Sequence, residues 1–225
     1  MGGRGALSSL PKTDGGGGAG SGGQWSNGLG FQNYDSLKDA LGKKGRKRSI
    51  ADAALNSNPH HDATYTYKEF TENCQRCVVA YEARRRGYDV TAQPTYKGDK
   101  LPKVAYVNPN TGAKYSYWMG AFKQAKSERI GGRTAKQTQK NIENKMKSYG
   151  DGSRAILRVS WKGGGGHVFN VEQKNGKTYY IDAQVGKRYT SKVFQNIRTE
   201  KTQLVRTDNL KFSDRAKNFV TKDKW

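Results

Sequence analysis

The sequence predicts an α+β domain in which an early helix packs against a mainly antiparallel sheet, behind a disordered, glycine-rich basic arm. Three observations support this fold class. Residues 1–48 are rich in glycine, with an unbroken run at residues 15–18, and hold few apolar anchors. An apolar stripe of helical spacing follows near residue 74, and alternating apolar residues, typical of strands, concentrate after residue 150. Because the arm cannot bury enough apolar surface to offset its ordering entropy, we expect the folded domain to span residues 49–225.

Composition and charge limit the classes of function. The formal net charge of +22 predicts attraction to nucleic acid, acidic proteins or anionic membrane surfaces, and equally fits a basic protein whose charge aids packaging or delivery. The basic run at residues 43–48, which closes the arm, fits contact with phosphates or a solvated linker. The sequence has no apolar run long enough to cross a membrane and no apolar segment of a secretory signal at its start, so neither is expected.

Helix and strand signals follow one another along the domain. Ser49 is expected to cap a helix over residues 49–55. An amphipathic helix is expected over residues 134–149. Short strands are expected at residues 88–92 and 203–206, and a longer one at residues 154–161. In the longer strand, alternation places Ala155, Leu157 and Val159 on one face and Ile156 and Arg158 on the other.

The central feature is a cysteine in the first turn of a helix expected over residues 72–86. Asn73 is a preferred N-cap residue, and Cys74 follows it directly. Free backbone N–H groups and the positive end of the helix dipole favour a thiolate there, so Cys74 is a candidate nucleophile. Cys77 lies one turn deeper on the apolar stripe and is expected to be a buried thiol. A redox pair or half of a zinc site would also contain Cys-x-x-Cys, but the βαβ context and the second pair that these need are absent from the sequence.

A hairpin supplies partners for this cysteine. Asn-Gly at Asn175 and Gly176, between two alternating runs, predicts a two-residue type I′ turn. Counting outward from that turn, His167 faces Gln184, and Asp182 lies diagonal to His167 on the same face, within reach of a carboxylate–imidazole hydrogen bond. The alternative is that His167 and Asp182 are ordinary structural residues, and a register slip of one residue would separate them.

These residue types fit nucleophilic catalysis at a carbonyl carbon. Asp182 would fix the tautomer of His167, and His167 would draw the proton from Cys74, whose thiolate would attack a carboxamide or amide. The backbone N–H of Cys74 and a side-chain amide, from Asn73 or Gln184, would support the oxyanion. This chemistry needs no cofactor. The pair His60 and His61 lacks cysteine or acidic partners at ligand spacing, so no metal site is expected.

Two further segments are candidates for contact with a substrate. The glycine run that ends with Gly165 and Gly166, directly before His167, allows close approach of a backbone or a substrate. Aromatic residues interleaved with lysines between residues 95 and 130, among them Trp118, fit a substrate groove, a covered core or a surface for single-stranded nucleic acid.

Several blocks of the sequence resemble a known family. They are residues 73–78 (Asn-Cys-Gln-Arg-Cys-Val), 85–90 (Arg-Arg-Gly-Tyr-Asp-Val), 166–170 (Gly-His-Val-Phe-Asn) and 182–184 (Asp-Ala-Gln). In this order they are similar to the papain-fold toxin family of protein-glutamine deamidases, found in polymorphic toxins and in phage minor capsid or head-morphogenesis proteins. The resemblance covers residues 65–212, and residues 149–155 and 161–165 resemble the phage-borne members.

The resemblance implies a papain-like cysteine-hydrolase fold with Cys74, His167 and Asp182 as a Cys-His-Asp triad. It implies conversion of protein glutamine side chains to glutamate, with release of ammonia. The protein would then be virion-associated or delivered into a target cell's cytoplasm.

Two other classes of function stay open from the sequence. One is a non-enzymatic, basic virion- or nucleic-acid-associated protein on an inactive papain-like fold, which the net charge favours. The other keeps the triad in a papain-like protease or a transglutaminase, since both use the same thioester chemistry.

Overall fold

A six-stranded antiparallel sheet lies at the centre of the fold. The computed structural model describes residues 31–61, 67–96, 99, 106–107, 114–115 and 117–222. The strand order in the sheet is β4-β9-β5-β6-β7-β8, and each neighbouring pair is antiparallel. The strands are β4 (Glu128–Arg129), β5 (Arg154–Ser160), β6 (Gly166–Lys174), β7 (Lys177–Asp182), β8 (Lys187–Tyr189) and β9 (Gln203–Arg206).

Helices and two smaller strand pairs surround this sheet. The α-helices are α1 (Leu37–Leu41), α2 (Ile50–Asn56), α3 (Lys68–Thr71), α4 (Cys74–Arg85) and α5 (Ala135–Tyr149). The short strands β1 (Thr91–Ala92) and β10 (Val220–Thr221) pair with each other, as do β2 (Tyr106–Val107) and β3 (Lys114–Tyr115). The 3-10 helices are η1 (Tyr117–Ala121), η2 (Ser191–Asn196), η3 (Thr199–Lys201) and η4 (Asp214–Asn218).

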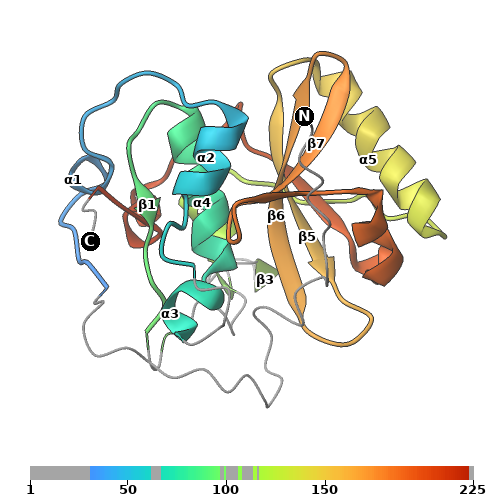
Figure 1. The fold of residues 1–225 in the computed structure, drawn as a ribbon, viewed down its shortest axis with the longest axis horizontal. Helices are drawn as coiled ribbons and strands as arrows, with labels where there is room; N and C mark the ends of the chain where they lie inside the picture. The colour runs from blue at the N-terminus through green and yellow to red at the C-terminus, as the bar shows by residue number, and fades with distance from the viewer. Residues whose placement is uncertain are drawn as a thin grey trace, which may run out of the picture.

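The two longest helices cover opposite faces of the sheet, α4 on one side and α5 on the other (Figure 1). Alternation along β5 divides its side chains between two cores. Ala155, Leu157 and Val159 join the core that includes Ile142 of α5, whereas Ile156 joins the core around α4. The face assignment made from the sequence is therefore confirmed. This arrangement of helices on a mainly antiparallel sheet is the predicted α+β class.

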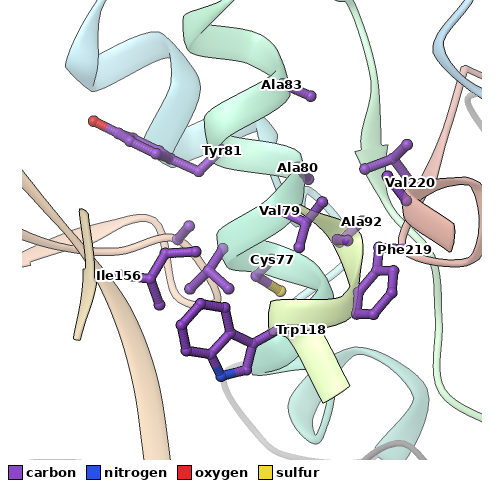
Figure 2. Packing of buried hydrophobic residues seen from close by; sticks show 14 of the residues in the cluster. Cys77, Val79, Ala80, Tyr81, Ala83, Ala92, Trp118, Ile156, Phe219 and Val220 are labelled. Atoms are coloured by element: carbon purple, nitrogen blue, oxygen red, sulfur yellow. The ribbon is translucent and has the colours of Figure 1, made fainter. Parts of the chain in front are cut away.

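Helix α4 is buried on nearly every side. Its buried side chains include Val79, Tyr81 and Ala83, and Cys77 lies beside Trp118 of η1 (Figure 2). The helix ends before Gly87, whose φ of 104° is accessible mainly to glycine. A Cβ at Gly87 would also lie 2.4 Å from the carbonyl oxygen of Gly45, so close chain packing requires glycine at this turn.

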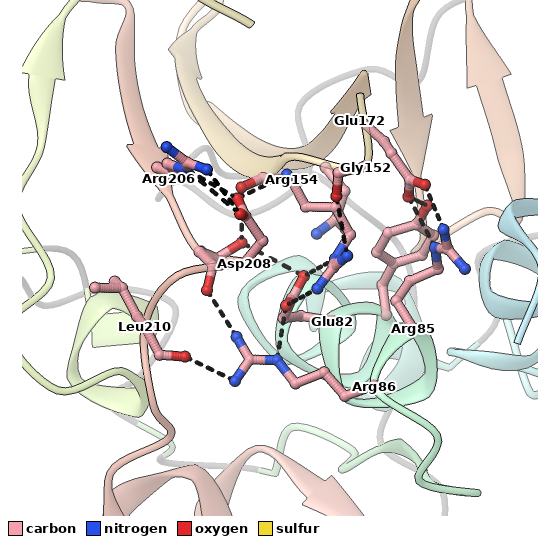
Figure 3. Close-up of polar contacts among 12 residues, drawn as sticks. Glu82, Arg85, Arg86, Gly152, Arg154, Glu172, Arg206, Asp208 and Leu210 are labelled. Carbon is pink, nitrogen blue, oxygen red and sulfur yellow. Dashed lines mark hydrogen bonds and ion pairs between the residues drawn. The ribbon is translucent and has the colours of Figure 1, made fainter. Parts of the chain in front are cut away.

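A buried ionic network attaches the second half of α4 to the sheet (Figure 3). Glu82 is fully buried and accepts hydrogen bonds from Arg86 Nε at 2.7 Å and from Arg154 Nε at 2.8 Å. Glu172 of β6 forms a second group with Arg85 and with the Tyr81 hydroxyl, which donates at 2.9 Å. Because each buried carboxylate has cationic partners, the network satisfies charges that would otherwise destabilise the interior.

The predicted helices match the structure closely. Ser49 and Thr134 cap α2 and α5, and their side chains accept hydrogen bonds from the backbone N–H of Asp52 and Gln137. The strand expected at residues 88–92 is shorter: only Thr91–Ala92 forms a strand, paired with β10, and Tyr88 makes an isolated bridge with Lys44. No described helix has the length and apolar character that a membrane crossing requires.

The expected boundary between the disordered arm and the folded domain, placed after residue 48, is wrong for the residues just before it. Helix α1 lies inside the span expected to be a disordered arm, and its Ala40 and Leu41 are buried. The Ser36 side chain caps it by accepting from the Asp39 N–H. Composition missed this helix because five residues carry little periodicity and α1 depends on its packing against η4. Residues 1–30 of the arm lie outside the described residues.

Candidate active site

The hairpin of β6 and β7 has the predicted turn and register. Asn175 and Gly176 have φ values of 50° and 69°, as a type I′ turn requires. Lys174 pairs with Lys177, and the ladder extends to Asn170 opposite Ile181. The ladder ends there, and Gln184 lies in the turn after β7, so its predicted pairing with His167 is not among the strand pairs. The turn and register derived from the sequence are therefore confirmed as far as Asn170 and Ile181, and Asp182 contacts His167 from the end of β7.

His167 and Asp182 meet in the buried interior. His167 Nε2 lies 2.9 Å from Asp182 Oδ2, and the two residues are 3% and 0% exposed. The imidazole is enclosed by aromatic rings. Trp161 stacks on it with a centroid distance of 6.0 Å, and Phe169 is tilted against it at 6.1 Å. Water is thereby kept from the hydrogen bond, which strengthens it.

Asp182 accepts hydrogen bonds from three donors. Besides His167, the hydroxyl of Tyr189 donates to Oδ2, and the backbone N–H of Gln184 donates to Oδ1 at 3.0 Å. Burial alone would raise the pKa of Asp182, but the charge and hydrogen bond of His167, followed by the other two donors, lower it below its ordinary value. The carboxylate is therefore held as an anion beside the imidazole.

Cys74 approaches the same imidazole from the first turn of α4. Burial alone would lower the pKa of His167, but the Asp182 carboxylate, and after it the nearby Cys74 side chain, raise it well above its ordinary value. Nδ1, the ring nitrogen that does not face Asp182, has no hydrogen-bond partner among the described residues, sulfur atoms included. Asp182 therefore holds one ring nitrogen, and the other is left to take a proton from the nearby Cys74 thiol.

Asn73 occupies the N-cap position of α4, but its side chain does not cap the helix, which corrects the capping role expected from the sequence. Its Nδ2 donates to Asn58 Oδ1 at 3.0 Å, and its Oδ1 accepts from Asn58 Nδ2 at 3.3 Å. The Asn73 backbone carbonyl accepts from the N–H groups of Arg76 and Cys77, so the Cys74 N–H lies ahead of the first intrahelical bond. The Asn73 side chain therefore pairs with the buried amide of Asn58 instead of capping the helix.

Cys77 is a buried thiol. It is 1% exposed, and its Sγ donates to Asn73 Oδ1 at 3.2 Å. Burial first, and then the negative charges of Cys74 and Asp182, raise the pKa of Cys77 well above its ordinary value. Its role as a hydrogen-bond donor inside the core distinguishes it from Cys74.

Gln184 lies next to the contact between the two strands and α4. Its backbone carbonyl accepts from Asn58 Nδ2 at 2.9 Å, and the residue is 1% exposed. Neither Oε1 nor Nε2 of its side chain has a hydrogen-bond partner among the described residues. A buried amide with both polar atoms unpaired is rare in folded proteins and occurs at functional sites.

The residues expected to line a groove have different positions. Trp118 is only 1% exposed and packs in the core around α4, and its backbone N–H donates to Gln75 Oε1 at 3.2 Å. The groove assignment for Trp118 is therefore corrected: burial of its large apolar ring outweighs exposure to a ligand. Gly165 is exposed in the loop between β5 and β6, and Gly166 is half-buried as the first residue of β6, directly before His167. A role for these two glycines in substrate contact stays a prediction.

Two residues of this site were not found from the sequence. Tyr189 belongs to β8. The register of the hairpin between β7 and β8, in which Asp182 pairs with Lys187, is the feature that could have placed it near Asp182. Asn58 joins Asn73 to Gln184 although it is distant from both in sequence, and no local pattern marks it. Within the described part of the chain, no cluster of three or more histidine, cysteine or acidic side chains is arranged to hold a metal ion.

Comparison with known proteins places this chain in a family. The family model described as papain fold toxin 1, glutamine deamidase matches residues 72–187, from two residues before α4 to the first residue of β8. The match spans just over half of the chain and contains Cys74, His167 and Asp182. No curated protein and no solved structure matches the chain. The chain belongs to the papain fold toxin 1, glutamine deamidase family.

Proposed function

We propose that this protein is a cysteine-dependent deamidase of protein glutamine side chains, with Cys74 as nucleophile, His167 as acid and base, and Asp182 as the residue that orients His167. The observation that carries the proposal is the position of the imidazole, which is hydrogen bonded to Asp182 and close to the Cys74 thiol. Family membership supports the same reaction class.

The first half of the reaction forms a thioester. His167 takes the proton of Cys74, and the thiolate attacks the side-chain carbonyl carbon of the substrate glutamine. Negative charge develops on the carbonyl oxygen, where the Cys74 N–H and the unpaired amide of Gln184 support it. The carbon–nitrogen bond then breaks, and the imidazolium of His167 protonates the leaving group, which departs as ammonia.

The second half hydrolyses the thioester. His167, now neutral, takes a proton from water, and the oxygen attacks the thioester carbon. The carbon–sulfur bond breaks, glutamate is released, and the proton returns to Cys74. Asp182 stays ionised throughout and holds the imidazole in one orientation. Its lowered pKa supports this role: burial would raise the pKa of Asp182, but the charge of His167 lowers it by more.

The decisive experiment incubates the full chain with proteins from a lysate of candidate target cells in heavy-oxygen water and maps peptides by mass spectrometry. Deamidation predicts conversion of glutamine to glutamate, with one heavy oxygen in each new carboxylate. Cys74→Ala is expected to abolish it and Cys77→Ser to retain it. New peptide termini would indicate a protease, and amine adducts after addition of a diamine would indicate a transglutaminase. If glutamines are unchanged, or change equally with Cys74→Ala, the proposal is wrong.

The route by which the protein reaches its substrate is part of the same proposal. A toxin of this family acts on proteins of a target cell, so we infer delivery into that cell's cytoplasm, with a phage particle as carrier. The net charge of +22 supports contact with nucleic acid during packaging. A DNA affinity that is weak and independent of salt would contradict the packaging role.

A further inference from the structure

Asp182 has a second side-chain partner besides His167. Tyr189 of β8 lies diagonal to Asp182, because Asp182 pairs with Lys187 and Tyr180 pairs with Tyr189. Its hydroxyl donates to Oδ2, the same oxygen that faces His167 Nε2. One carboxylate oxygen therefore binds the catalytic imidazole and the phenol together.

The phenol ring also contacts the imidazole. Tyr189 stands edge-on to His167 with a centroid distance of 6.4 Å and an interplanar angle of 77°. It stands edge-on to Phe169 at 5.1 Å, and it is 9% exposed. Because the ring is fixed by packing, its hydroxyl is held in one position against Asp182.

We propose that Tyr189 is a positioning residue of the active site, which holds Asp182 ionised and oriented so that His167 presents one ring nitrogen to Cys74. The catalytic role of Tyr189 rests on the proposed function, but its effect on the charge and orientation of Asp182 and His167 does not. A buried carboxylate keeps its charge only if donors satisfy it, and Tyr189 supplies one of three.

The charged and titratable groups around Asp182 come from three elements. His167 lies on β6, Lys187 and Tyr189 on β8, and the Cys74 and Cys77 thiols on α4. Lys187 is exposed, so water screens its charge. Tyr189 is therefore the β8 group that acts on the carboxylate by direct contact.

The test compares Tyr189→Phe with Tyr180→Phe in the full chain. Tyr180 is a matched control, since it pairs with Tyr189 across the strands and also stands edge-on to Phe169. Its hydroxyl faces Glu143 of α5 at 3.5 Å instead of Asp182. Each variant removes one phenolic oxygen, and only Tyr189→Phe removes a donor to Asp182.

The first readout is the free energy of unfolding in urea between pH 7 and pH 3. Burial would raise the pKa of Asp182, but His167, aided by Tyr189, lowers it. The ionised Asp182 therefore stabilises the folded protein above the unfolded pKa of about 3.9. This stability is lost as the pH falls through the lower pKa of the folded state. The deficit of Tyr189→Phe should be full at pH 7 and shrink toward pH 3. A deficit that does not change with pH would show a merely structural role and overturn the proposal.

The second readout is the rate at which iodoacetamide alkylates Cys74 at neutral pH, followed by mass spectrometry. We expect Tyr189→Phe to slow alkylation roughly tenfold, the size of one hydrogen bond to a charged group, and Tyr180→Phe to leave it unchanged. An equal rate in wild type and Tyr189→Phe would also overturn the proposal. Neither readout needs deamidase activity, so failure of the proposed function is distinguishable. With a substrate in hand, kcat should fall by a similar factor at unchanged KM.

Discussion

His167 Nε2 lies 2.9 Å from Asp182 Oδ2, and this contact links the ends of two neighbouring strands inside the protein. The pKa of His167 is raised despite burial, chiefly by the Asp182 charge, and the pKa of Asp182 is lowered despite burial, chiefly by the His167 charge. Both shifts describe one interaction. It stabilises the fold above the ordinary carboxyl pKa of about 3.9 and below the ordinary imidazole pKa of about 6.5, and it is lost beyond the shifted values on either side.

Replacement of Asp182 by Asn should lower kcat/KM by at least about 100-fold, because the imidazole loses the partner that sets its tautomer. The pKa of His167 is raised against burial mainly by Asp182, so in this variant burial should dominate and the pKa should fall. The alkaline limb of the pH–activity profile should move to lower pH. The profile of kcat/KM against pH measures both effects.

Asp214→Asn serves as the control for that variant. Asp214 is an exposed aspartate whose pKa is also lowered, first by a hydrogen bond from Lys217, and it lies in η4. Its replacement should leave the profile unchanged. An alkaline limb that stays in place with Asp182→Asn would contradict the role given to the carboxylate.

The two cysteines should respond oppositely to substitution by Ser. Cys74→Ser should abolish turnover, because a hydroxyl is not ionised by this imidazole as a thiol is. Cys77→Ser should keep activity within about threefold and cost about 1–2 kcal/mol, since its hydroxyl still reaches Asn73 in a buried site. Turnover numbers and urea unfolding of both variants give the comparison. Loss of activity with Cys77→Ser in a folded protein would count against the assignment of Cys74.

Glu82→Gln should destabilise the fold by about 3–5 kcal/mol, because it leaves Arg86 and Arg154 without their buried counter-charge. Urea unfolding at neutral pH measures the loss. Glu128→Gln is the matched control. Glu128 pairs with Lys145 at the surface, with side chains 39% and 35% exposed, so we expect a cost below about 1 kcal/mol. Equal costs for the two variants would refute the structural role of the network in Figure 3.

Gly176→Ala should cost about 1–2 kcal/mol through backbone strain alone. Gly176 has a φ of 69°, and a Cβ there would meet nothing within 4 Å. Gly163→Ala is the control, since Gly163 also has open space around it and needs no positive φ. Thermal unfolding of the two variants separates strain from packing, and an equal loss in both would argue against the type I′ turn.

Local sequence was enough to predict the elements that present the site. The Asn175–Gly176 turn sets the strand register because a two-residue loop permits one pairing, and that register brings Asp182 toward His167. The start of α4 at Cys74 also follows from local signals, although the side chain of Asn73 makes other contacts. These predictions succeeded because the groups that decide them lie within a few residues of one another.

Tertiary packing decided the rest. It brought the first turn of α4 to His167, placed Tyr189 on Asp182 and joined Asn58 to Asn73 and Gln184. It also buried Trp118, which decided between the core and the groove readings left open by the sequence, and it ordered α1 within the span expected to be disordered. Contacts between residues far apart in the chain depend on how all the elements pack together. The sequence by itself determined which groups were candidates for the site, and only the fold decided which of them meet.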